Sequence, residues 1–451
     1  MSILASKSYY PGDVICVEKP FVKVLKHEWW DKMCSGCCSK NTGLKKCGAC
    51  KIMKYCGNNC QKNDWPDHKF ECPYLRNYTD FRNEDVVHLI GKLILKLKGQ
   101  DWKSAISKIL NVEVSFDDLL SHSDRGFQNS SCDRQNISNT VESFIGKENM
   151  PDKEILLELF GKVIINRFGF TCGKYPYSND LENGVDMLSR DNDGSAIFMG
   201  VSKIDHSCIP NAVFYINGDS ITVRAQRDIK KSEKITIAYT HMVSSPDAYL
   251  SHEFAKLKFK EKCYCSDCSQ IPGESKLTKI LDASKAADVL LDTRKALNAF
   301  SKSGRTKCPN PENTMTRDYL KNLLKRQDEA LGRTHLRRMQ LLSLLYPLEY
   351  QNESKEEVIS KEEMRAGYVE LTESMREVWG DYYFELLPYY RKIGLLNQDL
   401  KNQTVAKAYG YKVWRLESVS YGSCFNFDNG RWEDALSEEE FQYLLRQNSA
   451  E

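Results

Sequence analysis

The chain has 451 residues, which is more than one hydrophobic core usually organises, so two to three domains are expected. Hydrophobic residues make up 41% and charged residues 28% of the chain, as in ordinary globular proteins. The formal net charge of +2 excludes a global polyanion-binding surface, so any nucleic-acid contact would be local and weak.

No apolar run approaches the roughly 18 residues that a membrane helix needs, and the first residues do not form a signal-peptide pattern. The 17 cysteines would suggest disulfides in a secreted chain, but many of them cluster at metal-ligand spacings. A reducing compartment, the cytoplasm or the nucleus, is therefore the better interpretation.

Residues 1–30 predict a strand, a turn and a second strand. Tyr9 and Tyr10 are followed by the turn residues Pro11, Gly12 and Asp13, and the apolar stretch 14–17 comes directly after them.

Residues 34–72 carry the strongest signal in the sequence, eight N/S ligands in four closely spaced pairs. They match two tetrahedral zinc sites of two pairs each. The segment has few large apolar residues beyond Trp65 and Phe70, so metal must supply most of its folding free energy. Free thiols or disulfides are the alternative, which the regular spacing disfavours, and Cys38 is a surplus cysteine. The ligands are Cys34, Cys37, Cys47, Cys50, Cys56, Cys60, His68 and Cys72.

Lysines outnumber acids in the same segment, which leaves two interpretations open. They form a weak surface for phosphate or acidic peptides, or they only solvate a small module that lacks a large core; the second is favoured.

Residues 73–195 are predicted to be largely helical. Val86, Ile90, Leu93 and Leu97 share one helical face, and a second helix that opens at Pro151 ends near Asn166. Polar and small residues over 178–195 predict a loop.

An apolar segment over 196–201 leads into the polar corner Asp205-His206-Ser207-Cys208. A hairpin follows, with strands over 213–216 and 221–225 and Asn217-Gly218 as its turn. A third strand over 235–239 ends on Tyr239.

Three cysteines after this region, Cys263, Cys265 and Cys268, supply one ligand fewer than a tetrahedral zinc site needs. From residue 271 the chain is predicted to be helical, with a linker over 301–316. Met364, Tyr368 and Leu371 begin an apolar stripe at spacings of four and three, which indicates packed core helices.

The Asp-His-Ser-Cys-Ile-Pro-Asn corner and the later Thr-Ile-Ala-Tyr stretch resemble the core of a SET domain, and residues 34–72 resemble a MYND zinc finger. Together they resemble the SET-and-MYND family. The resemblance implies an α+β fold. Its β-rich SET domain would be interrupted by the finger and by a helical insert. A post-SET zinc flap and a helical domain similar to tetratricopeptide repeats would follow. The implied domains are the N-terminal part of SET (1–33), the MYND finger (34–72), the helical insert (73–195), the SET catalytic core (196–241), the post-SET zinc region (242–270) and the C-terminal helical domain (271–451).

The resemblance also implies three zinc ions. Pairs alternate in a MYND finger, which assigns Cys34, Cys37, Cys56 and Cys60 to one ion and Cys47, Cys50, His68 and Cys72 to the other. In the post-SET arrangement Cys208 completes a third site with Cys263, Cys265 and Cys268; the alternative is that Cys208 is an ordinary buried thiol.

The family's active site implies roles for four residues. Tyr239 would be the channel tyrosine, and His206 would contact S-adenosylmethionine largely through its backbone. Asn166 would touch the cofactor or be a solvated residue at a helix end. Asp205 stands where the family usually has asparagine; it would meet the donor's ammonium by charge or cap a turn.

Several positions depart from the family pattern. Val114, Leu120 and His122 stand where the family often has Tyr, Glu and Asn. Phe259 replaces a second channel tyrosine, and Glu261 replaces an aromatic residue that covers the adenine. The Gly-x-Gly turn that helps to hold the methyl donor is absent from the first residues.

Two functions remain, and the first is favoured. One is a protein-lysine N-methyltransferase that uses S-adenosylmethionine to methylate an exposed lysine of a histone or another protein. The other is a catalytically weak or inactive scaffold that binds peptide partners through the finger and the helical domain. A monomer is expected in both cases.

Overall fold

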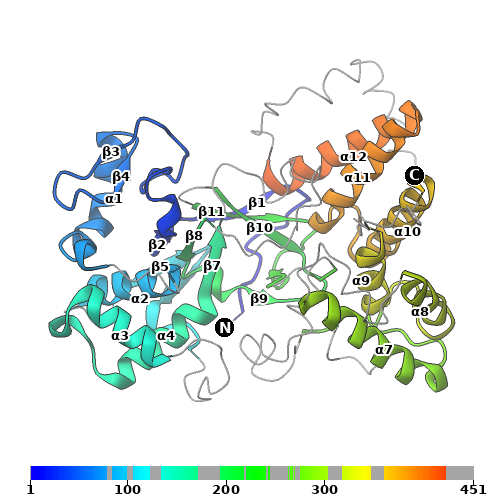
Figure 1. Cartoon of the computed structure of the whole chain (residues 1–451), viewed down its shortest axis with the longest axis horizontal. Helices are drawn as coiled ribbons and strands as arrows, with labels where there is room; N and C mark the ends of the chain where they lie inside the picture. The colour runs from blue at the N-terminus through cyan, green and yellow to red at the C-terminus, as the bar shows by residue number, and fades with distance from the viewer. Residues whose placement is uncertain are drawn as a thin grey trace, which may run out of the picture.

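The computed structural model describes residues 2–78, 84–98, 105–121, 134–170, 193–217, 220–239, 242–243, 263, 265–267, 269, 275–302, 317–346 and 360–422. The molecule has three parts side by side: the finger with the first helices, a central group of strands, and the C-terminal helices (Figure 1). This mixture of small sheets and helices, with a cysteine-rich finger and a helical C-terminal part, confirms the predicted α+β class.

Two three-stranded sheets occupy the centre, and each joins strands that are distant in sequence. One has the order β1-β11-β10, and the other has the order β2-β8-β7; both are antiparallel. Their strands are β1 (Val14–Glu18), β2 (Val22–Leu25), β7 (Arg167–Phe170), β8 (Gly194–Ile197), β10 (Ala212–Asn217) and β11 (Ser220–Ala225).

Two predictions at these strands were wrong in detail. Asn217 pairs with Ser220 and so belongs to strand β10, although it was expected in the turn; residues 218 and 219 lie outside the described part. Gly194 and Ser195 lie in β8, where the loop over 178–195 was expected to continue; the other residues of that loop, apart from Asp193, lie outside the described part. In both cases backbone pairing with a neighbouring strand outweighs the local turn preference of Asn, Gly and Ser.

Three two-stranded pairs complete the strands. The strands β9 (Asp205–His206) and β12 (Thr236–Ile237) pair in parallel, so the expected strand over 235–239 is shorter than predicted. The other pairs are β3 (Lys45–Lys46) with β4 (Lys54–Tyr55) and β5 (Ile106–Ile109) with β6 (Val112–Ser115).

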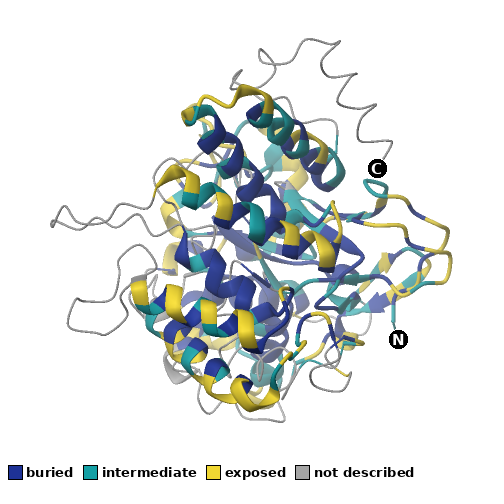
Figure 2. Cartoon of the chain, turned by 90° about the vertical axis from the view of Figure 1, so that its right-hand side faces the viewer, coloured by how far each residue is buried: buried dark blue, intermediate teal, exposed yellow. Residues whose placement is uncertain are grey.

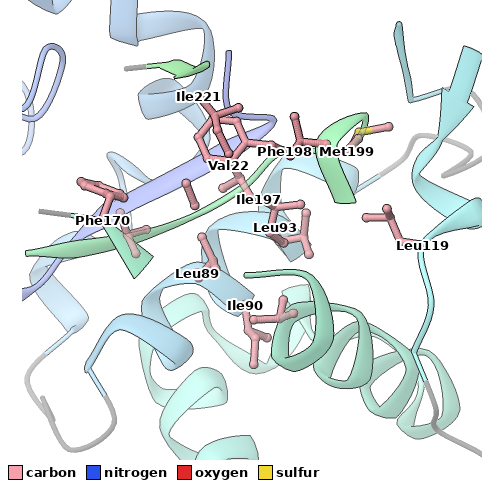
Figure 3. Close-up of a cluster of buried hydrophobic side chains, with 14 of the residues drawn as sticks. Val22, Leu89, Ile90, Leu93, Leu119, Phe170, Ile197, Phe198, Met199 and Ile221 are labelled. Carbon is pink, nitrogen blue, oxygen red and sulfur yellow. The ribbon is translucent and has the colours of Figure 1, made fainter. Parts of the chain in front are cut away.

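Helix α2 (Glu84–Leu97) is the centre of the first core, as its apolar period predicted. Leu89, Ile90 and Leu93 are fully buried and lie beside Val22 and Ile197 from the β2-β8-β7 sheet (Figure 3). Helices α1 (Asn58–Glu71), α3 (Arg134–Ile145) and α4 (Lys153–Asn166) pack against α2. The predicted helix ending near Asn166 is therefore confirmed.

The second core is helical and lies on the other side of the strands. Successive helices pack against one another, and the outer ones carry a buried and an exposed face (Figure 2), whereas α9 has no exposed residue. Tyr368, Leu371 and Met375 of the predicted stripe are buried. The helices are α7 (Ala283–Lys302), α8 (Arg317–Ala330), α9 (Leu336–Leu345), α10 (Lys361–Trp379), α11 (Leu387–Asp399) and α12 (Gln403–Tyr421).

Short 3-10 turns complete the fold. They are η1 (His27–Trp29), η2 (Leu75–Asn77), η4 (Phe116–Asp118), η6 (Lys147–Asn149), η8 (Val201–Lys203) and η9 (Phe384–Leu386). Within the described ranges, no helix combines the length and the apolar character that a bilayer crossing requires.

Candidate metal centres and active site

The first four-cysteine group of the finger forms where a loop, the end of β4 and the first turn of α1 meet. The ligand atoms of Cys34, Cys37, Cys56 and Cys60 all lie within 4.8 Å of one another. The Cys37 and Cys56 sulfurs are 3.8 Å apart. Tetrahedral zinc with bonds of about 2.3 Å to sulfur places two sulfurs about 3.8 Å apart, so the group fits zinc.

The second group has three cysteines and one histidine, and all four are buried. Cys47, Cys50, His68 and Cys72 also lie within 4.8 Å of one another, with 3.9 Å between the Cys47 and Cys72 sulfurs. The distance from Cys50 Sγ to His68 Nε2 is 3.6 Å, which is also the separation of about 3.6 Å that tetrahedral zinc gives one sulfur and one nitrogen. Both groups are the sets that the alternating pairs predicted.

The pKa values of these thiols show why the groups suit a cation. Burial raises the pKa of Cys34 and of Cys72 to about 12. At Cys50 burial is again the largest single influence and raises the pKa, but hydrogen bonds with His68 and with the Ile52 and Met53 amides, together with the charge of His68, outweigh it and the pKa falls to about 6. Several thiolates cannot coexist at such short distances without positive charge, which a divalent metal supplies.

Glu71 connects the second group to helix α2. Its carboxylate is buried and lies 3.2 Å from His68 Nδ1, 2.7 Å from His88 Nε2 and 2.8 Å from Lys92 Nζ. Burial alone would raise the pKa of Glu71, but Lys92 and the two histidines hold it well below its usual range. The carboxylate orients His68 so that Nε2 faces the cysteines, as second-shell carboxylates do at zinc sites.

A third group lies at the polar corner after η8. His206 Nε2 is 3.4 Å from Cys208 Sγ, and Cys208 Sγ is 3.9 Å from Cys263 Sγ. The three ligand atoms lie within 4.8 Å of one another. The Cys265 amide donates to Cys263 Sγ over 3.5 Å. The sulfur separation again fits zinc, while Cys268 lies outside the described residues.

The corner and Tyr239 are brought together by the parallel pair β9 and β12. The Ser207 amide donates to the Ile237 carbonyl over 3.0 Å, and the Tyr239 hydroxyl donates to the Ile204 carbonyl over 2.7 Å. Burial raises the pKa of Tyr239, with a smaller contribution from Asp205, so the phenol is neutral at physiological pH. Asp205 lies in β9 and forms a half-exposed ion pair of 2.8 Å with Lys234.

Asn166 is buried at the end of α4, and both N–H groups of its amide have partners. They donate to the carbonyls of Leu120 and Lys162, each over 2.8 Å. Lys162 is itself buried and donates to the Asp117 and Leu119 carbonyls over 2.8 and 2.7 Å. Helix α4 therefore fixes the 117–120 segment.

The departures from the family pattern fall in different surroundings. Val114 is buried in β6, whereas the Leu120 side chain is 58% exposed. His122, Phe259 and Glu261 lie outside the described residues.

The C-terminal helices hold the segment that follows Tyr239. The amides of Met242 and Val243 donate to the two Glu385 carboxylate oxygens over 2.6 and 3.0 Å. The Met242 carbonyl accepts from Gln340 over 2.8 Å, and the Val243 carbonyl accepts from the Ser343 hydroxyl over 3.3 Å.

The same helices also reach the polar corner, because the Trp379 indole donates to the Cys208 carbonyl over 2.7 Å.

Sequence reasoning did not identify Glu71, Glu385 or the role of the His206 ring. The only local signal was for Glu71, an acid three residues after a metal-ligating histidine. The partners of the other two are far away in sequence, so no spacing reveals them.

Comparison with known proteins agrees with this geometry. The MYND finger model matches residues 34–72. The chain is 28% identical over 271 residues to mouse histone-lysine N-methyltransferase SMYD3, covering 59% of this chain and 58% of that protein. It is 27% identical over 292 residues to ASHR1, a histone-lysine N-methyltransferase of Arabidopsis thaliana, covering 64% of this chain and 57% of that protein.

Human N-lysine methyltransferase SMYD2 is 27% identical over 309 residues, covering 67% of this chain and 66% of that protein. The chain thus spans less than two thirds of the length of the first relatives that it matches. The finger, the zinc-binding cysteine clusters and the similarity beyond the finger agree with one another: over more than half of its length the chain is similar to lysine methyltransferases of the SET-and-MYND family.

Proposed function

We propose that this chain is a protein-lysine N-methyltransferase that transfers a methyl group from S-adenosylmethionine to an exposed lysine of a histone or another protein. The observation that carries the proposal is the parallel pairing of β9 with β12, which joins Asp205 and His206 to the strand that precedes Tyr239. In this proposal the twelve predicted ligands hold three structural zinc ions.

Methyl transfer from a sulfonium needs a neutral amine, so the substrate lysine must first lose a proton from a group with a pKa of about 10.4. Burial and the nearby positive sulfonium both lower that pKa. The enzyme's main task is then to align the amine with the methyl carbon in a narrow channel. S-adenosylmethionine supplies the electrophilic methyl group when it is bound.

Tyr239 is proposed to line that channel. Its hydroxyl donates to the Ile204 carbonyl, so the oxygen presents lone pairs to other groups. Lone pairs suit a methyl group that carries partial positive charge.

Asn166 and Asp205 are proposed to contact the cofactor's ammonium. Because both Asn166 N–H groups donate to backbone carbonyls, the amide oxygen is the atom that could accept from an ammonium. Asp205 would have to exchange Lys234 for the cofactor, since the two form an ion pair. His206 would contribute its backbone.

The domain boundaries at residues 33, 72, 195, 241 and 270 are part of the same proposal, as are a monomeric state and a location in the cytoplasm and nucleus. The finger and the C-terminal helices would bind peptide partners.

Calorimetric titration of the full-length, zinc-loaded chain with S-adenosylmethionine tests cofactor binding. We expect saturable binding, and Tyr239→Phe should retain it while methylation of a lysine-containing protein falls at least tenfold. Tyr10→Phe is the matched control, because Tyr10 is 66% exposed and far from β12 in sequence. Absence of binding by the intact protein would contradict the proposal.

One observation favours the second candidate, a catalytically weak or inactive scaffold. At two positions where the family often has Tyr and Glu, this chain has a buried Val114 and an exposed Leu120, neither of which can hydrogen-bond a cofactor through its side chain. A scaffold would bind a partner protein but not S-adenosylmethionine, so the same titration separates the two.

A further inference from the structure

The ring of His206 lies between the third metal group and the backbone of Tyr239. Its Nε2 is 3.4 Å from Cys208 Sγ. Its Nδ1 is 3.0 Å from the Tyr239 amide nitrogen, with that amide as the donor. The ring is also inclined against the Tyr239 ring, with centroids 5.2 Å apart.

These two contacts decide which ring nitrogen carries the proton. A backbone amide can only donate, so Nδ1 must present its lone pair to Tyr239. The proton of the neutral ring is then on Nε2, which has no lone pair in the ring plane to offer a metal. Nε2–H instead points toward the Cys208 sulfur.

His68 in the finger provides an internal comparison, because its proton is on the other ring nitrogen. Its Nε2 also lies close to a cysteine sulfur, at 3.6 Å from Cys50. However, its Nδ1 faces the Glu71 carboxylate, which can only accept. The proton of His68 is therefore on Nδ1, and Nε2 is available to bind zinc.

We propose that His206 is a positioning residue that connects the third zinc site to Tyr239, and that it is not a zinc ligand although its ring lies within ligand distance. Its Nε2–H donates to the Cys208 thiolate, and its Nδ1 accepts the Tyr239 amide. His206 would thus act through its ring as well as through its backbone.

The connection has a mechanical basis. His206 and Tyr239 lie on or next to the paired strands β9 and β12, and the ring bridges the residues that follow these strands. Hydrogen bonds to a metal-bound thiolate stabilise its negative charge, and second-shell partners of this kind typically change metal affinity about 10–100-fold. Occupancy of the metal site and the position of Tyr239 are thereby coupled.

NMR of the full-length protein, labelled with 15N-histidine and loaded with 113Cd in place of zinc, tests the protonation directly. We expect His206 to carry its proton on Nε2 and to show no coupling to cadmium. His68 should carry its proton on Nδ1 and couple to cadmium through Nε2. Coupling between His206 and cadmium would overturn the proposal.

Two substitutions test the two hydrogen bonds of the His206 ring separately. His206→Asn places an amide oxygen near the Nδ1 position, so it should retain the Tyr239 contact and release the third zinc about 10–100-fold faster to a chelator. His206→Gln places an amide nitrogen near the Nε2 position, so it should retain that zinc but speed hydrogen exchange of the Tyr239 amide. Equal effects of both variants on both measurements would contradict the proposal.

None of these measurements involves S-adenosylmethionine or methyl transfer. If the chain neither binds S-adenosylmethionine nor methylates lysine, the expected protonation of His206 is therefore unchanged. The NMR measurement on the wild-type protein also tests the role of His206 when a variant does not fold.

Discussion

Glu71 shows how one side chain joins the zinc finger to the rest of the molecule. Its carboxylate accepts from His68 on α1 and from His88 and Lys92 on α2. A small cavity beside it is lined by residues of the finger, β2 and α2, including Lys23, Met53 and Asp64. The finger is therefore attached to helix α2 by a buried polar network as well as by apolar contacts.

Glu71→Gln should weaken the second zinc site and leave the first unchanged. The substitution removes the charged acceptor that orients His68, which lowers metal affinity about 10–100-fold. It also leaves Lys92 buried without its counter-ion, which costs about 3–5 kcal/mol of stability. Chelator competition with a colorimetric zinc reporter should show one ion leaving early. Glu28→Gln at an exposed position is the control, and identical release curves would contradict the role of Glu71.

At the scale of elements, α4 lies so close to the 117–121 segment that only glycine fits at the contact. A Cβ atom on Gly161 would lie 2.3 Å from the Ser121 carbonyl oxygen. Because that oxygen belongs to the backbone, the clash cannot be relieved by a side-chain rotation. The close approach also explains how Asn166 and Lys162 reach the carbonyls of the same segment.

Gly161→Ala should lower the stability of the zinc-loaded protein by about 1–3 kcal/mol. The alanine would push the 117–121 segment away from α4 and break the Asn166 contact. Thermal unfolding followed by circular dichroism measures the change. Gly48→Ala is the matched control, because a Cβ atom there meets nothing within 4 Å. A Gly161→Ala protein as stable as this control would contradict the prediction, because the 117–121 segment would then move away at little cost in free energy.

The elements also show what the sequence could predict. Helices α2 and α4 follow from apolar residues at helical spacing, and the predicted finger ligands follow from pairs of cysteine or histidine with two or three residues between them. The β5-β6 hairpin was not predicted, since each of its strands has only four residues. Asn217 was predicted in the hairpin turn but lies in strand β10, because register depends on the partner strand.

The candidate site was predictable where its chemistry is local. The contacts of Glu71 with α2, of Glu385 with Met242 and of His206 with Tyr239 join residues distant in sequence. Such contacts depend on the completed fold, so spacing alone cannot indicate them.

For the whole molecule, the C-terminal helices contribute directly to the surroundings of the candidate active site. Side chains from α9 and η9 satisfy both amides and both carbonyls of Met242 and Val243. Glu385 is fully buried and also accepts from the Tyr383 hydroxyl. The C-terminal part therefore fixes the chain three residues after Tyr239.

Glu385→Ala should loosen that attachment. Two buried amides would lose their charged acceptor, which costs about 2–4 kcal/mol. Hydrogen exchange measured by mass spectrometry should become faster in peptides that contain residues 242–243. The control is Glu362→Ala, which removes an exposed carboxylate from the first turn of α10. Unchanged exchange in the Glu385 variant would show that the carbonyl contacts suffice.

The pairing of β2 with β8, and of β1 with β11, has a consequence for synthesis on the ribosome. Strands β1 and β2 emerge long before their partners β11 and β8. The finger, which follows β2 in the chain, can already bind metal during this interval. Nascent chains should therefore expose these strand edges to chaperones until residues beyond 225 have been translated. Soluble yield should consequently respond to chaperone supply and translation speed as well as to zinc in the growth medium.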